Sequence, residues 1–352
     1  MQNHKHIISS FDAYLVGQAK KIIDGYDLQH FKQTNASSKP IEAICILDKF
    51  CRSRVTPTPK RIVFSACYLK QKQTLPTHLA ARTEELESLI KQGSPRINKT
   101  KPRSDSFISD HINRLFDKRG FICDFMLYDL NVIHFNIASN KKKEDSLVFA
   151  IIDKEDAYFI CIGTHRDLYN SQEHSKVIDV LSEEYPDYIE KWMPKIRGID
   201  PSTEHLDTSQ VKKMKLSGVN AMILDSNGDL RASVHGMLSC ARTPMLPMTN
   251  LQRIISELIQ ISDHLLITNF RSDFSFIGLE YNDSKPTCIF KPPKSMKYTY
   301  CPISPHYTGL LWLLDLFIKI ELITGKNYRK IIPTIDARAK SRKNKKRLAG
   351  KR

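Results

Sequence analysis

The sequence predicts an α+β protein with a central helix and a twisted antiparallel sheet, flanked by an N-terminal α/β region and a C-terminal α+β domain. Two observations indicate this class. Short runs rich in Ile, Val, Phe and Tyr follow one another between residues 131 and 169, as strands of a half-buried sheet do. Apolar residues at helical spacing lie on both sides of that stretch. A chain of 352 residues can form two or three domains, each with its own core.

Residues 1–93 are predicted to form a mixed α/β region. Apolar side chains fall on one helical face in 10–30, and an apolar patch follows at 41–50. Residues 61–68 have the composition of a strand, and 79–90 that of a helix that ends before Gly93. Residues 94–103 are polar, basic and contain two prolines, which is typical of a linker.

The predicted central domain covers residues 104–200. Ser104 or Asp105 is expected to cap a helix over 105–118, which Gly120 ends. Three strands are then predicted, joined first by a basic turn and then by an acidic one: 132–138, 146–153 and 157–163. A helix over 177–193, broken near Pro186, completes the domain.

Residues 201–335 are predicted to form the C-terminal α+β domain. Asn227-Gly228 predicts a hairpin within 218–236 through a type I′ turn. The same DSNGD segment resembles the first half of a calcium loop, but the bidentate glutamate of such a loop is missing. The remaining expected elements are a helix, two strands and a closing helix, at 249–266, 274–281, 288–291 and 307–323.

Composition excludes several classes of protein. The eight cysteines have no Cys-x-x-Cys spacing, so neither a metal site nor a disulfide framework is predicted, and no cofactor is expected. Walker and Ser-x-x-Lys motifs are absent, which argues against NTPase and acyl-transfer chemistry. The first residues lack a signal-peptide pattern and no apolar run has the length of a membrane span, so the expected location is the cytoplasm.

The end of the chain carries much of its positive charge. The formal net charge is +16, and residues 337–352 contain nine Lys or Arg and no acid. Such a block repels itself and cannot bury apolar surface, so 336–352 is predicted to be a disordered tail. Its alternatives are a solvated tail without a specific partner and an arm that binds the phosphates of RNA or another nucleic acid. The expected contacts on nucleic acid are Arg342, Lys343, Lys345, Lys346 and Arg347.

Residues suited to phosphodiester chemistry lie near the ends of the predicted central strands. His134 is in the first strand, and His165 and Arg166 come just after the third. Histidine can act as acid or base near neutrality, and arginine binds two phosphate oxygens at once. The alternative is that these are ordinary residues of a sheet.

The run IGTHRDLY, residues 162–169, resembles the Ile-Gly-His-Arg-x-x-x-Tyr run that ends the last strands of RelE/ParE-like toxins, with Thr164 inserted. The resemblance covers about residues 104–195. The run YDLNVIHFNIAS also resembles uncharacterised bacterial proteins with a second histidine where this chain has Asn136. The first resemblance implies a microbial-ribonuclease-type fold and metal-independent cleavage of RNA or ribosome-bound mRNA.

The resemblance also implies roles for individual residues. His134 would be the base or would position substrate, His165 would be the acid, and Arg166 would bind the scissile phosphate. Contacts to nucleic acid are implied for Asn136, Lys141, Lys142, Lys143 and Tyr169. An antitoxin or defence-complex partner is a further expectation. If the missing histidine is the working one, the chain binds nucleic acid without cutting it. The remaining alternative is a regulatory or docking protein of a mobile-element or antiphage system.

Overall fold

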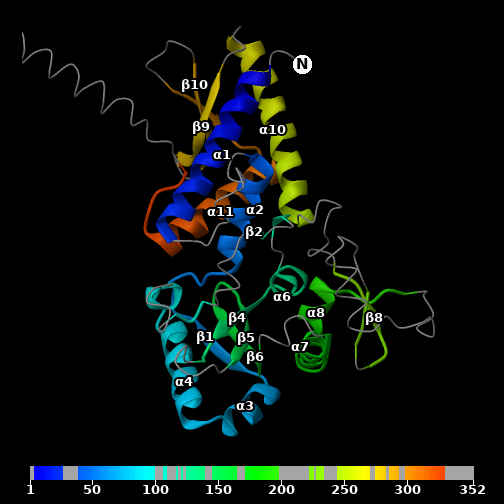
Figure 1. The fold of residues 1–352 in the computed structure, drawn as a ribbon. Coiled ribbons are helices and arrows are strands. Elements are labelled where there is room, and N and C mark those ends of the chain that lie inside the picture. Colours follow the sequence, from blue (N-terminus) through cyan, green and yellow to red (C-terminus); the bar gives the residue numbers. More distant parts are fainter. Residues whose placement is uncertain are drawn as a thin grey trace, which may run out of the picture.

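The structure is a computed structural model of the chain. It describes residues 4–26, 39–99, 106–108, 116–117, 120–121, 124–138, 145–164, 171–197, 222–225, 227–233, 244–269, 274–282, 285–292 and 298–329. These residues form two lobes, one above the other in Figure 1. The upper is called the helical lobe and the lower the sheet lobe. Together they are mixed α+β, which confirms the predicted class.

The helical lobe combines segments from the two ends of the chain. Its elements are α1 (Lys5–Tyr26), α2 (Pro40–Arg52), α10 (Met245–Asn269), β9 (Ser275–Asn282), β10 (Lys285–Lys291), β11 (Thr299–Pro302) and α11 (Thr308–Thr324). The three strands form an antiparallel sheet in the order β11-β10-β9.

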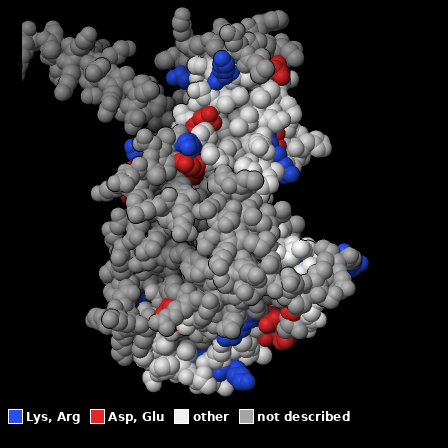
Figure 2. All heavy atoms as spheres, turned by 45° about the vertical axis from the view of Figure 1, so that its right-hand side comes forward, with Lys and Arg blue, Asp and Glu red and all other residues white. Residues whose placement is uncertain are grey.

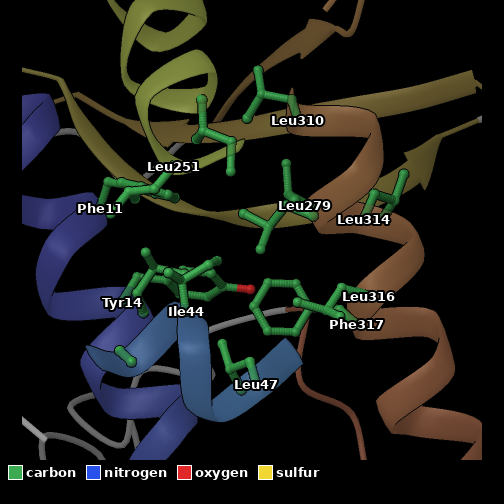
Figure 3. Close-up of a cluster of buried hydrophobic side chains, with 14 of the residues drawn as sticks. Phe11, Tyr14, Ile44, Leu47, Leu251, Leu279, Leu310, Leu314, Leu316 and Phe317 are labelled. Atoms are coloured by element: carbon green, nitrogen blue, oxygen red, sulfur yellow. The ribbon is translucent and has the colours of Figure 1, made fainter. Parts of the chain in front are cut away.

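One hydrophobic core joins all four helices of this lobe to its sheet. Figure 3 shows Phe11 and Tyr14 of α1 in this core beside Ile44 and Leu47 of α2, together with side chains from α10, β9 and α11. The Tyr14 hydroxyl donates to the carbonyls of Tyr328 and Arg329, both at 2.9 Å. The end of the described chain is thereby held against its beginning.

The sheet lobe is built around a four-stranded sheet. Its strands are β1 (Arg61–Phe64), β4 (Val132–Asn136), β5 (Leu147–Ile152) and β6 (Asp156–Gly163), in the order β1-β6-β5-β4. β1 runs parallel to β6, and the other neighbours are antiparallel. The helices are α3 (Ala66–Gln73), α4 (Thr77–Lys91), α6 (Phe125–Asp129), α7 (Ser171–Glu184) and α8 (Pro186–Trp192), with a 3₁₀ turn at Pro95–Asn98. Two small hairpins pair β2 (Phe116–Asp117) with β3 (Gly120–Phe121), and β7 (Ile223–Leu224) with β8 (Leu230–Arg231).

Both faces of the central sheet are covered, which explains why its strands are continuously apolar. In β5, Val148 and Ala150 pack in the cluster that includes Leu86 of α4. Phe149 and Ile151 point the opposite way, into the cluster that includes Leu181 of α7. The three strands predicted from this composition are therefore confirmed as β4, β5 and β6.

The helix predicted over 105–118 is wrong where the structure describes it. Ile108 forms an antiparallel bridge with Phe135 of β4, and the Asn136 N–H donates to the Phe107 carbonyl at 2.7 Å. Phe116 belongs to β2. The open edge of β4 has backbone groups that need partners, and an extended segment satisfies them while still burying Phe107 and Ile108.

The hydrophobic cores do not follow the predicted division at residue 93. α1 and α2 pack with α10 and α11, whereas β1, α3 and α4 belong to the sheet lobe. The described part of the predicted linker is also packed, because Ile97 is buried and Asn98 is hydrogen-bonded to both backbone groups of Val55. Burial of apolar surface therefore decides the arrangement at both places.

The hairpin predicted around Asn227-Gly228 is present, but its turn differs from the predicted type. The Asp225 N–H donates to the Asp229 carbonyl, and the Gly228 N–H donates to the Asp225 carbonyl, both at 3.0 Å. Gly228 has a φ of 78°. Asp225 and Asp229 thus close a three-residue loop with a left-handed glycine, in place of a two-residue type I′ turn.

Candidate functional site

His134 lies in the interior of the sheet lobe. It stands in β4 opposite Phe149 of β5, and its side chain is 0% exposed. Its Nδ1 is 3.5 Å from Oδ2 of Asp124, which is itself almost fully buried. The other carboxylate oxygen of Asp124 accepts the Leu127 N–H at 3.1 Å and caps α6. A helix cap therefore holds a carboxylate beside the imidazole.

The chain reverses between α6 and β4 at Asn131, and this reversal brings Asp124 to His134. Asn131 has a φ of 52°, a left-handed conformation that asparagine tolerates better than most residues. The sequence predictions did not include Asp124. An aspartate just before the apolar segment FMLYD is a readable cap signal, but its contact with His134 depends on this reversal.

The Asp124 carboxylate is close enough to form an ion pair with the His134 imidazole when that ring is protonated. A general base, however, must come within hydrogen-bond distance of the proton that it removes. In this structure the covered face of the sheet separates His134 from solvent.

Asn136, two residues further along β4, has a local role in the backbone. Its Oδ1 accepts the Ala138 N–H at 2.9 Å, which shapes the chain as it leaves the strand. Asn136 pairs with Leu147, which pairs in turn with Gly163 of β6. β4 and β6 therefore end at the same edge of the sheet, on either side of β5, and His134 lies further inside the sheet than this edge.

The structure does not place the other predicted site residues. The following lie outside the described residues: His165, Arg166, Lys141, Lys142, Lys143, Tyr169, Arg342, Lys343, Lys345, Lys346 and Arg347. Of the whole predicted set, His134 and Asn136 are the two whose surroundings can be described.

A second group of charged residues lies where the lobes meet, and the sequence predictions missed it. Arg52, at the end of α2, donates from Nε to Asp48 at 2.9 Å and from Nη1 to Asn131 Oδ1 at 3.4 Å. Its guanidinium also lies over the rings of Tyr128 and Trp192, at 5.3 and 5.9 Å from their centroids. Burial opposes this charge, but Asp48 raises the pKa of Arg52 above its ordinary value. The Asp48/Arg52 spacing of four residues was the available sequence signal.

Lys60 joins this group from the segment before β1. Its ammonium donates to the carbonyls of Asp153 and Lys154, both at 2.9 Å. Burial, and then the nearby charge of Lys319, lower its pKa. Arg52 thus links α2 of the helical lobe to Asn131 of the sheet lobe, whereas the hydrogen bonds of Lys60 lie within the sheet lobe.

Charge on the described surface is mixed in sign. On the face in Figure 2, blue Lys and Arg atoms lie near red Asp and Glu atoms over both lobes. Residues 1–336 carry a net charge of +7, since nine of the sixteen excess charges are in 337–352. The tail is therefore the main concentration of positive charge in the sequence.

Two features are absent from the described residues. These residues contain no group of three or more His, Cys, Asp or Glu side chains placed to hold a metal ion. None of their helices is both long enough and apolar enough to cross a membrane. No family model matches the chain, and neither the curated proteins nor the solved structures include a match to it.

Proposed function

We propose that this protein binds RNA in the cytoplasm through its basic tail and acts there without cutting it. The observation that carries this proposal is the concentration of nine cations in the last sixteen residues. Phosphate contacts by Lys and Arg release counterions and supply most of the sequence-independent affinity for nucleic acid. The mixed charges in Figure 2 give the described surface no comparable excess on that face.

The burial of His134 favours binding over cleavage. The residue proposed as base is 0% exposed, and its Nδ1 faces Asp124. Asn136 stands where the resembling bacterial proteins have a second histidine, and its Oδ1 already accepts a backbone N–H. Both arrangements suit a protein that retains the sheet and does not perform the proton transfers.

The decisive measurement is the salt dependence of RNA binding. The full chain and a five-substitution tail variant would be titrated with single-stranded RNA by fluorescence anisotropy at several salt concentrations. The tail residues changed to Gln are Arg342, Lys343, Lys345, Lys346 and Arg347. If each contacts one phosphate, the slope of log K against log salt becomes shallower by about 3.5, at about 0.7 per contact.

A matched control removes the same charge from the folded surface. Five exposed lysines would be changed to Gln: Lys5, Lys20, Lys70, Lys91 and Lys191. We expect this variant to keep a slope close to that of the wild type. Equal slopes for the wild type and the tail variant would refute the proposal, as would equal losses in the two variants. Binding of duplex DNA in preference to RNA would refute the choice of RNA.

Metal-independent RNA cleavage is the second candidate, and the Asp124–His134 pair favours it. Its test is incubation of labelled RNA with the wild type and with His134→Ala in the presence of a chelator, together with growth on expression of each. Cleavage and growth arrest that disappear in His134→Ala would establish the nuclease and overturn the binding-only proposal. Intact RNA with both proteins would support that proposal.

A further inference from the structure

Two cysteines lie opposite each other on neighbouring strands of the three-stranded sheet in the helical lobe. Cys288 of β10 and Cys301 of β11 are direct partners in an antiparallel register. Both pack at the same hydrophobic core, with Cys288 fully buried and Cys301 half-buried. Both are free thiols in this structure.

The backbone spacing of this pair fits a disulfide. The Ile303 N–H donates to the Pro286 carbonyl at 2.7 Å, so the 286/303 pair is hydrogen-bonded. Hydrogen-bonded pairs alternate along an antiparallel ladder, which makes 288/301 a pair of the same kind. The Cα atoms of such a pair are about 5.5 Å apart, within the range of disulfides. The Cβ atoms of a hydrogen-bonded pair are about 5.5 Å apart and must approach by at least about 1 Å, so the bond should be more easily reduced than an unstrained one.

We propose that Cys288 and Cys301 form a reversible cross-strand disulfide when the protein meets a hydroperoxide. The Cys301 sulfur, as thiolate, attacks one peroxide oxygen. An S–O bond forms, the O–O bond breaks, and the leaving oxygen takes a proton and departs as water when the oxidant is hydrogen peroxide. The Cys288 sulfur then attacks the sulfenic sulfur of Cys301. An S–S bond forms, the S–O bond breaks, and the hydroxyl leaves as water with the Cys288 proton.

The two steps need no reactant besides the two thiols and the peroxide. Two thiols lose two electrons in total, and the peroxide is reduced to two molecules of water. Cys301 takes the first step because it is the half-buried member of the pair, while Cys288 lies behind it in the core. The product joins β10 to β11 covalently and closes the connection between them.

The environment of the pair sets the rate of this reaction. Burial raises the pKa of the Cys301 thiol to about 11. Burial also raises the pKa of Cys288, and the nearby Cys301 and Glu257 raise it further. The thiolate is the reacting form, so below pH 11 oxidation should accelerate about tenfold for each unit of pH. At neutral pH the pair should therefore respond slowly and to sustained oxidant.

The test uses the full chain and hydrogen peroxide at several pH values. After quenching with an alkylating reagent, trypsin cleaves between the two cysteines after Lys294 and Lys297, so the disulfide joins two separate peptides. We expect mass spectrometry to show these joined peptides, lighter by about 2 Da than their sum, and dithiothreitol to separate them. The rate of their formation should rise with pH as stated.

Two variants complete the design. Cys301→Ser should abolish the joined peptides, whereas Cys67→Ser, which removes another half-buried thiol, should leave their yield unchanged. The peptide map of the wild-type protein tests the proposal even if a variant fails to fold. Exhaustive oxidation that leaves Cys288 and Cys301 alkylated, or joins either of them to a different cysteine, would overturn the proposal.

Discussion

Substituting alanine at three glycines separates two causes of instability in this fold. Gly93 follows α4 with a φ of +65°, and a Cβ there would lie 2.4 Å from the backbone of Thr58 and of Pro59. Gly325 ends α11 with nearly the same φ of +67°, but a Cβ there would meet nothing within 4 Å. Gly17 lies inside α1 with no such φ and no close neighbour.

The expected free energies of unfolding follow from this geometry. Gly325→Ala incurs the left-handed penalty alone and should lose about 1–2 kcal/mol. Gly93→Ala incurs the same penalty and also displaces backbone, which adds about 1–3 kcal/mol, so its total loss is about 2–5 kcal/mol. Gly17→Ala should gain about 0.5–1 kcal/mol, because alanine has less conformational freedom to lose in a helix.

Urea unfolding followed by far-UV circular dichroism would measure the three variants against the wild type. The expected order of stability is Gly17→Ala, wild type, Gly325→Ala and Gly93→Ala. A Gly93→Ala protein as stable as Gly325→Ala would show that the backbone of residues 58–59 does not lie against Gly93. That result would refute the packing of the segment that leads into β1.

Two further predictions concern local contacts. The Ser65 hydroxyl caps α3 and donates to a buried carbonyl of β6, so Ser65→Ala should cost about 1–3 kcal/mol by urea unfolding. Ser94→Ala, which removes a more exposed cap, should cost less than about 1 kcal/mol. Burial opposes ionisation of Asp225, but hydrogen bonds from Arg231 and two backbone N–H groups lower its pKa below the ordinary value near 4. This carboxylate therefore stabilises the fold above about pH 4, and that contribution is lost as pH falls through its lowered pKa. In Asp225→Asn, proton uptake on acid unfolding should be smaller than in the wild type. An unchanged pH dependence of the free energy of unfolding would refute the assignment.

The elements that the sequence predicted well are those in which one local pattern settles the outcome. β4, β5 and β6 are short apolar runs bounded by charged turns, and both of their faces are buried. The break between α7 and α8 falls at Pro186, which cannot continue a helix interior.

The failed predictions depend on contacts between distant segments. Phe107 and Ile108 fit a helical stripe, but pairing with the edge of β4 makes them extended. The joining of α1 and α2 to α10 and α11 also leaves no local pattern in the sequence. In the site, the alternation of side chains along the strand indicates that His134 and Asn136 share one face of the sheet. It does not indicate that the cluster around α7 covers this face.

In the proposed RNA binding, the roles of the tail and of the lobes follow from the position of the last described residues. The Leu279 N–H of β9 donates to the Arg329 carbonyl at 3.0 Å, and the Tyr14 hydroxyl donates to the same carbonyl. The segment that leads to the nine tail cations therefore starts from a fixed point on the helical lobe. Phosphate contacts fix position and supply affinity but carry no sequence information, so any preference among RNAs must come from the lobes. Neutralising the tail should consequently weaken binding to all RNAs by a similar factor and leave the ratio between a preferred and a random sequence unchanged.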